Sequence, residues 1–87
     1  MKNTENIIRV AYFGGESRRG QYAVNYMIAT TENADGDPVE LYSEVPYDDE
    51  RFGDDVDSFD DYAEPILRAD IIAQAEENGI DPARLVF

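Results

Sequence analysis

Hydrophobic and polar positions alternate with a period of two in three stretches of the first half of the chain. These stretches are rich in β-branched and aromatic residues, and they cover residues 7–13 (IIRVAYF), 21–30 (QYAVNYMIAT) and 39–45 (VELYSEV). A glycine-rich segment at 14–20 and a segment of turn-forming residues at 33–38 (NADGDP) separate them. We therefore predict three antiparallel strands that follow one another as a meander, joined by two hairpin loops.

Helical spacing replaces this alternation later in the chain. Residues 46–57 (PYDDERFGDDVD) follow neither period, which predicts a long acidic loop with at most one short turn. We expect a short turn at 58–63 and a main helix that begins near Glu64, because Pro65 would then occupy the first helical position, where its missing N–H costs nothing. The predicted buried stripe of this helix consists of Leu67, Ile71, Ile72 and Ala75, and its predicted water-facing side consists of Arg68, Gln74, Glu76 and Glu77.

The last ten residues predict how the helix ends and where the chain goes next. The segment 78–80 (NGI) is a helix stop, residues 81–82 (DP) start one further turn, and the apolar residues 85–87 predict a short strand tied into the sheet. The expected fold class is α+β, with a small three- to four-stranded antiparallel sheet and one main helix packed on one face. Residues 1–87 form a single domain in this prediction.

The composition excludes most kinds of enzyme. The 87 residues include no Cys and no His, so the chain can have no disulfide, thiolate nucleophile, cysteine zinc site or imidazole base. Paired carboxylates are the remaining catalytic option, and they need a cleft that one thin core can scarcely build. We therefore expect no enzymatic activity, no catalytic residues, no cofactor and no metal site.

The negative charge is concentrated in one third of the chain. Seven basic residues stand against 20 acidic ones, which gives a formal net charge of -13. Residues 35–64 hold 13 of the acidic residues and one base, Arg51, whereas the rest of the chain is close to neutral. Such a field opposes direct binding to nucleic acid. The polar first residues and the lack of a long apolar run predict a cytoplasmic protein with no membrane contact.

Several simpler explanations account for less of the acidic stretch. A generally acidic, salt-adapted protein would spread its acids over the whole chain, and a purely solubilising loop would not need so much mutual repulsion. A calcium loop starting at Asn33 has proline where glycine is required, and one starting at Asp48 has phenylalanine at two ligand positions. In the glycine-rich segment, Arg18 and Arg19 form either a small anion contact or an ordinary exposed loop.

We hypothesise that the acidic stretch forms a surface that imitates DNA, because such a function would explain why the chain tolerates the repulsion among these acids. Glu40 and Glu44 would share one face of a strand with Tyr42 between them, and successive positions on that face are about 6.6 Å apart, comparable to the step between phosphates. Aromatic residues among the acids would supply flat anchoring contacts for a protein partner. The candidate partner-binding residues are Asp35, Asp37, Glu40, Tyr42, Glu44, Tyr47, Asp48, Asp49, Glu50, Phe52, Asp54, Asp55, Asp57, Asp60, Asp61 and Glu64.

In size, charge and the acidic cluster at 35–64, the chain resembles the small phage-encoded anti-CRISPR proteins and the related antirestriction proteins that imitate DNA. The resemblance is one of class and involves no matched motif. It implies a monomeric, non-enzymatic inhibitor in the host cytoplasm that binds a basic DNA-binding protein, a CRISPR-Cas effector complex, at the surface that reads the PAM or holds target DNA.

Two alternatives remain open at this point. The chain could be an acidic interaction module that binds a basic host partner with no connection to nucleic acid, and displacement of the protein by DNA would separate this case from mimicry. It could also be a phage structural or assembly protein, which would self-associate stably in solution.

Overall fold

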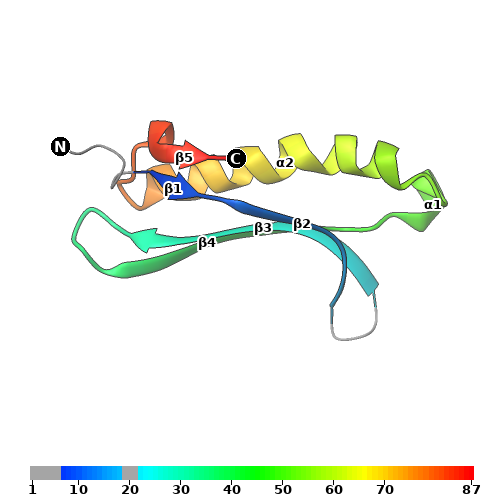
Figure 1. Cartoon of the computed structure of the whole chain (residues 1–87), viewed down its shortest axis with the longest axis horizontal. Coiled ribbons are helices and arrows are strands. Elements are labelled where there is room, and N and C mark those ends of the chain that lie inside the picture. Colours follow the sequence, from blue (N-terminus) through cyan, green and yellow to red (C-terminus); the bar gives the residue numbers. More distant parts are fainter. Residues whose placement is uncertain (1–6, 19–21) are drawn as a thin grey trace.

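Three long strands and one long helix dominate the structure (Figure 1). In the computed structural model, which describes residues 7–18 and 22–87, strands β2, β3 and β4 form an antiparallel sheet in that order, and helix α2 lies across one face of it. The predicted α+β class, with one main helix on one face of a small antiparallel sheet, is confirmed. In chain order the elements are β1 (Ile8–Arg9), β2 (Ala11–Arg18), β3 (Tyr22–Glu32), β4 (Pro38–Pro46), α1 (Asp49–Phe52), α2 (Val56–Glu77), the 3-10 helix η2 (Pro82–Arg84) and β5 (Leu85–Val86).

The short strands β1 and β5 lie side by side. They pair in parallel, with Ile8 opposite Leu85, and form a two-stranded sheet of their own. The N–H of Val10 continues the pairing by donating to the carbonyl of Val86 at 2.9 Å. The predicted strand at the end of the chain is therefore confirmed, but it joins β1, and the predicted strand over residues 7–13 is divided at Val10.

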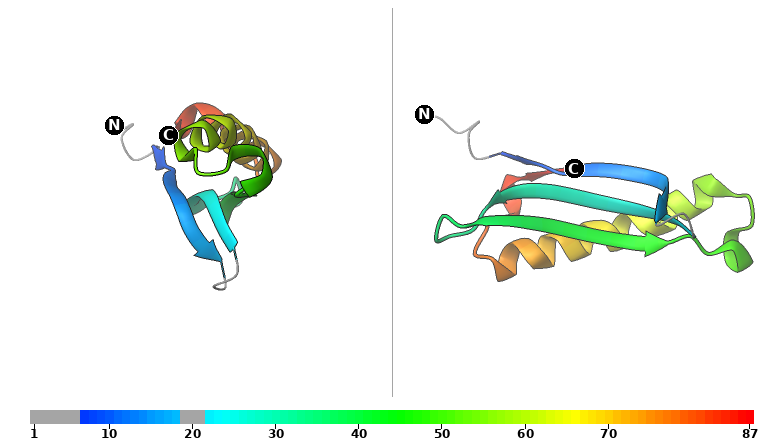
Figure 2. Two further views of the ribbon diagram at one scale, coloured as in Figure 1. Left: turned by 90° about the vertical axis from the view of Figure 1, so that its right-hand side faces the viewer. Right: turned by 90° about the horizontal axis from the view of Figure 1, so that it is seen from below.

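Helix α2 packs on the sheet through side chains spaced by four residues. On the sheet side, Met27 pairs with Ser43 and Ala29 pairs with Leu41, and all four are buried. Full burial of a large apolar side chain is worth about 1.5–3 kcal/mol, so this layer contact is the main apolar core. The other face of the sheet is not covered by the helix (Figure 2). The fully buried residues of α2 are Phe59, Ala63, Leu67, Ile71 and Ala75.

The helix is longer than predicted and begins before its proline. It starts at Val56, so Pro65 lies inside it and a separate turn at 58–63 is wrong. Pro65 cannot donate to the preceding turn, but its ring lies on the exposed side of the helix. The earlier start buries Phe59 and Ala63 completely, and these contacts offset the lost hydrogen bond. The predicted long loop at 46–57 is correspondingly shortened, and it contains the one-turn helix α1.

The glycine-rich segment belongs mostly to a strand. β2 continues to Arg18, and its register shifts between Phe13 and Glu16, where Gly15 has a φ of +68°. A glycine at this position allows a bulge in which the strand turns sharply without leaving the sheet. The predicted loop over 14–20 therefore begins too early. Residues 19–21, including Arg19 of the predicted anion contact, lie outside the described residues.

The predicted turn between the second and third strands and the predicted helix stop are both confirmed. Asn33 Oδ1 accepts from the N–H groups of Asp35 and Asp37, both at 2.9 Å, and so closes the turn. Gly79 follows the helix with a φ of +72°, and Ile80 folds back into the core with 3% of its surface exposed.

Gln74 does not face water as predicted. Its Oε1 accepts from the N–H of Tyr42 at 3.0 Å, and its Nε2 donates to the carbonyl of Tyr42 at 2.6 Å. β4 is an edge strand, so the outward peptide groups of Tyr42 have no strand partner, and the amide of Gln74 takes that place. Of the predicted apolar stripe, Ile72 is half-buried and the other members are buried.

None of the helices in the described part of the chain is both long enough and apolar enough to span a membrane.

Candidate functional site

The sixteen predicted partner-binding residues do not lie in one row. Asp35 and Asp37 lie in the turn between β3 and β4, at one end of a molecule that is 47 Å long (Figure 1). Glu40, Tyr42 and Glu44 lie on β4, in positions that alternate with the core residues and therefore face away from α2. The other eleven lie at the opposite end, from the end of β4 through α1 to the first half of α2 (Figures 1 and 2).

Nine of those eleven residues carry carboxylates, and we call them the acidic end. Arg51 is the one base within the same stretch, so residues 48–64 carry a net charge of -8. Helices α1 and α2 hold most of these carboxylates on regular backbone. The acidic end consists of Asp48, Asp49, Glu50, Asp54, Asp55, Asp57, Asp60, Asp61 and Glu64.

Four carboxylates of the acidic end have partners within the protein. Asp48 caps α1 by accepting from the N–H of Arg51 at 3.1 Å. Asp55 caps α2 by accepting from the N–H and the hydroxyl of Ser58, at 3.2 and 2.8 Å. Glu64 forms an exposed ion pair with Arg68, four residues on, at 3.0 Å.

Asp60, the fourth carboxylate with a partner within the protein, belongs to a hydrogen-bond network around Asn25. This asparagine is 2% exposed, and its Nδ2 donates to Asp60 Oδ1 at 2.7 Å and to the Tyr12 hydroxyl at 2.9 Å. Its Oδ1 accepts from the N–H of Gly15 at 2.8 Å, which ties the bulge of β2 to the same point. Burial, opposed by the Asn25 bond and reinforced by the charge of Asp60, raises the pKa of Tyr12 above its ordinary 10.0.

Five carboxylates remain exposed, and within residues 7–18 and 22–87 their side chains form no hydrogen bond or ion pair. Asp49, Glu50 and Asp57 lie in the first turns of their helices, where negative charge is mildly favourable. None of the five forms a cap or an ion pair in the described part of the chain, and they repel one another, so they are the part of the acidic end that is available to a partner. Asp57 and Asp61 lie one helical turn apart on α2, which places their Cβ atoms about 5–6 Å apart. The five are Asp49, Glu50, Asp54, Asp57 and Asp61.

Aromatic rings pack beneath these carboxylates. The fully buried ring of Phe59 lies 4.6 Å from Tyr47, 5.4 Å from Phe52 and 6.2 Å from Tyr62, measured between centroids. The Arg51 guanidinium lies 4.7 Å from the centre of the Tyr62 ring and 5.1 Å from that of Phe52. Tyr47 and Phe52, predicted as anchors for a partner, are half-buried against the core and serve the fold as well.

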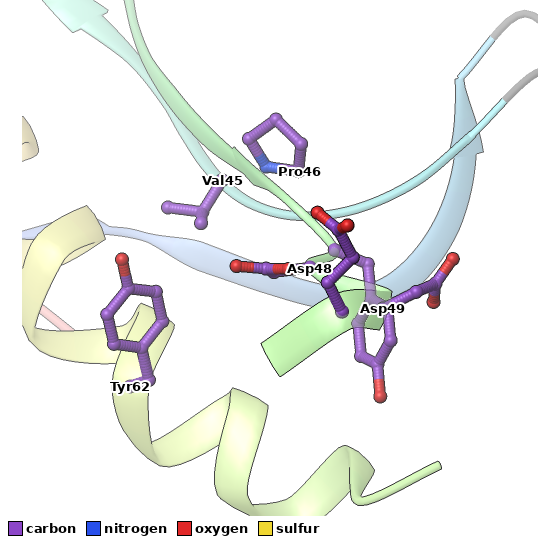
Figure 3. Close-up of a pocket in the computed structure, with 7 residues that line it drawn as sticks. Val45, Pro46, Asp48, Asp49 and Tyr62 are labelled. Atoms are coloured by element: carbon purple, nitrogen blue, oxygen red, sulfur yellow. The ribbon is translucent and has the colours of Figure 1, made fainter. Parts of the chain in front are cut away.

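An open hollow of about 520 Å³ lies between the end of β4, α1 and α2. In Figure 3, Tyr62 stands on α2 at one side of it, Asp48 and Asp49 lie at the other, and Val45 and Pro46 lie at the end of β4. Tyr47 and Glu50 complete the lining. The hollow therefore combines three carboxylates and two phenol rings with an apolar edge.

Several carboxylates of the acidic end lie close enough to Tyr47 to affect its pKa. Loss of hydration, followed by the negative charges of Asp49, Asp54 and Asp55, raises the pKa of its phenol above the ordinary 10.0. Its hydroxyl donates to the carbonyl of Gly53, which fixes the ring. Acids from both helices therefore act on one point at the mouth of the hollow.

A second exposed surface lies on the open face of the sheet. The rings of Phe13 and Tyr26 stack at 4.9 Å, and Tyr26 and Tyr42 follow at 5.5 Å, so one aromatic row crosses all three long strands. The Tyr42 hydroxyl donates to Glu44 at 2.6 Å. The predicted face with Glu40, Tyr42 and Glu44 thus exists, but it is an aromatic surface bordered by two carboxylates.

Sequence reasoning missed Tyr62, Asn25 and Gln74. Tyr62 becomes recognisable once the helix starts at Val56, because it then lies one turn after the buried Phe59 and is itself 37% exposed. Nothing in the local pattern distinguishes Asn25 or Gln74, whose partners are ten to 35 residues away.

Within the described ranges, no three carboxylates are grouped closely enough to hold a metal ion. Comparison of the chain with known protein families, curated proteins and solved structures finds no match.

Proposed function

We propose that the protein is a non-enzymatic inhibitor whose acidic end imitates DNA and occupies the DNA-binding surface of a basic protein. The observation that supports this most is the set of five exposed, unpaired carboxylates, four on helices α1 and α2 and one on the connection between them, at one end of an elongated molecule. The mutual repulsion in such an arrangement opposes folding, because the like charges lie close together. Attraction to a cationic surface is the function that it fits.

The spacing of the acids is complementary to a partner surface that binds the phosphates of DNA. Acidic residues one helical turn apart have their Cβ atoms about 5–6 Å apart, and regular helical backbone holds them in register. A DNA-binding groove presents Arg and Lys side chains at complementary spacing, so it would attract this surface from a distance and hold it on contact. The resemblance to anti-CRISPR proteins makes the PAM-reading surface of a CRISPR-Cas effector the first partner to test.

Two triple variants with the same change in charge provide the test. Asp54→Asn, Asp57→Asn and Asp61→Asn together remove three charges from the acidic end without touching a helix cap, whereas Asp35→Asn, Asp37→Asn and Glu40→Gln remove three charges toward the far end of the molecule. The first triple should weaken binding to the effector at least tenfold, which corresponds to about 1.4 kcal/mol, and the second should change it less than about threefold. Equal losses would assign the effect to net charge alone.

Competition with DNA tests the mimicry itself. A duplex that carries the recognition site should lower the apparent affinity of the protein in proportion to its concentration and leave the maximal binding unchanged. An effector already locked on a long heteroduplex should resist the protein. A ternary complex of protein, effector and site-bearing DNA would overturn the proposal.

The aromatic row on the open face favours a second candidate, a protein-interaction module whose partner has no connection to nucleic acid. Exposed aromatic rings of this kind are typical anchors in protein interfaces. In that case Phe13→Ser would abolish partner binding, the acidic-end triple would retain it, and DNA would not compete.

A further inference from the structure

We infer that the hollow at the acidic end is a receptor for one arginine side chain of the partner protein. This inference rests on the proposed function and makes it more specific, because it identifies which contact within the acidic end recognises the partner and which chemical group it takes. The remaining carboxylates would attract the basic surface, and the hollow would fix its orientation.

The lining of the hollow matches the two chemical properties of a guanidinium. Asp49 and Glu50 provide exposed carboxylates with no partner in the described part of the chain, and such groups accept paired hydrogen bonds from the planar fork of an arginine. Tyr62 and Tyr47 provide aromatic rings on which a guanidinium can stack.

The protein itself places a guanidinium on one of these rings. Arg51 lies 4.7 Å from the centroid of Tyr62, so this ring already contacts one guanidinium within the protein, and an arginine of the partner would stack beside Arg51 or take its place. Carboxylates alone would attract any cation equally. The combination of rings and carboxylates is what selects arginine.

Both rings are held in place before any partner arrives. Tyr47 donates to the carbonyl of Gly53 and packs on Phe59, and Tyr62 lies 5.3 Å from Phe52. A site whose rings need no reorganisation loses little conformational entropy on binding. This rigidity supports recognition of a single side chain at a defined position.

Titration of the whole protein with blocked amino acids tests the receptor without the partner. The probes are N-acetyl-arginine methylamide, its lysine and citrulline counterparts, and spermidine, and the readout is two-dimensional NMR of backbone and tyrosine signals. Arginine should bind saturably, at least fivefold more tightly than lysine or spermidine, and should shift the signals of Val45, Tyr47 and Tyr62. Citrulline should cause no saturable shift, because it has the same shape without the charge.

Matched variants assign the contacts. Tyr62→Leu should weaken arginine binding at least fivefold, whereas Tyr62→Phe, which keeps the ring, should stay within twofold of the original protein. Asp49→Asn with Glu50→Gln should also weaken it at least fivefold, and Asp57→Asn with Asp61→Asn, the same change in charge outside the hollow, should weaken it less than twofold. Unchanged signals from the strands would show that each variant is folded.

Equal affinity for arginine, lysine and spermidine, or shifts spread evenly over the acidic end, would overturn the receptor. If arginine fails to bind, but the variant with Asp54, Asp57 and Asp61 changed to Asn still binds the effector more weakly, the arginine receptor is wrong and the DNA mimicry is still supported. If arginine binds in the hollow but DNA does not compete for the partner, the receptor is supported and the mimicry is wrong.

Discussion

Asn25 donates a hydrogen bond from its side-chain amide to the carboxylate of Asp60 at 2.7 Å, and this bond crosses from the middle of the sheet to the first half of α2. The same amide group also bonds to Tyr12 and to the N–H of Gly15, so one buried side chain joins two strands, a bulge and the helix. The position of the acidic end relative to the sheet depends on this connection.

Replacing Asn25 by Ala should therefore destabilise the protein more than any change at the exposed acids. The N–H of Gly15, the Tyr12 hydroxyl and Asp60 would lose their bonds to Asn25. Because Gly15 and Tyr12 are exposed, water can replace part of the loss, so the cost is about 1–3 kcal/mol in the free energy of unfolding. Asp60→Asn keeps an acceptor for Asn25 and removes a negative charge, so it should cost less than about 1 kcal/mol. Urea denaturation measures the free energy of unfolding of both variants. Equal losses of stability in the two would show that the network is not centred on Asn25.

Asp55 and Asp61 are both exposed acids of the acidic end, but only one of them supports the fold. Asp55→Ala should lower the free energy of unfolding by about 1 kcal/mol, because the N–H of Ser58 in the first turn of α2 loses the carboxylate that caps the helix. Asp61→Ala should leave stability unchanged or raise it, since it removes repulsion and introduces a good helix former. Thermal denaturation of the two variants side by side checks this, and a larger loss for Asp61→Ala would contradict the assignment of the cap.

Tyr12 contributes to stability in a way that is lost at alkaline pH. Its pKa is raised in the fold, mainly by burial and also by the charge of Asp60, so the neutral phenol is favoured. The contribution is fully present below the unfolded value near 10 and is lost as pH rises through the higher folded value. Urea midpoints measured between about pH 8 and about pH 11 should fall less steeply for Tyr12→Phe than for the original protein. Parallel curves would exclude Tyr12 as the source.

The unpaired carboxylates should make the fold more stable in salt. Between about 50 and about 500 mM NaCl the Debye length falls well below 10 Å, so repulsion among Asp54, Asp57 and Asp61 is screened. The melting temperature should rise over this range, and the rise should be smaller in the variant with all three changed to Asn. An equal rise in both proteins would mean that these residues contribute nothing to the repulsion.

Local patterns were sufficient to predict the sheet, the turn at Asn33 and the helix stop at Gly79, because each depends on residues close together in the chain. The start of α2 could not be predicted in this way. Pro65 indicates a helix start locally, and only the tertiary burial of Phe59 outweighs it. The charge cluster was also evident from sequence, but its division between the two ends of the molecule follows from the length of β4, which runs from the turn at Asp35 to the acidic end.

The contact between Gln74 and Tyr42 has a consequence for the behaviour of the protein at high concentration. Strands at the border of a sheet tend to recruit strands from other molecules, which leads to aggregation or exchange of segments. A neighbour approaching β4 would have to break two hydrogen bonds of Gln74 at the same time, in the middle of the strand. The helix thereby protects the border strand β4 against intermolecular sheet growth, in addition to covering the core.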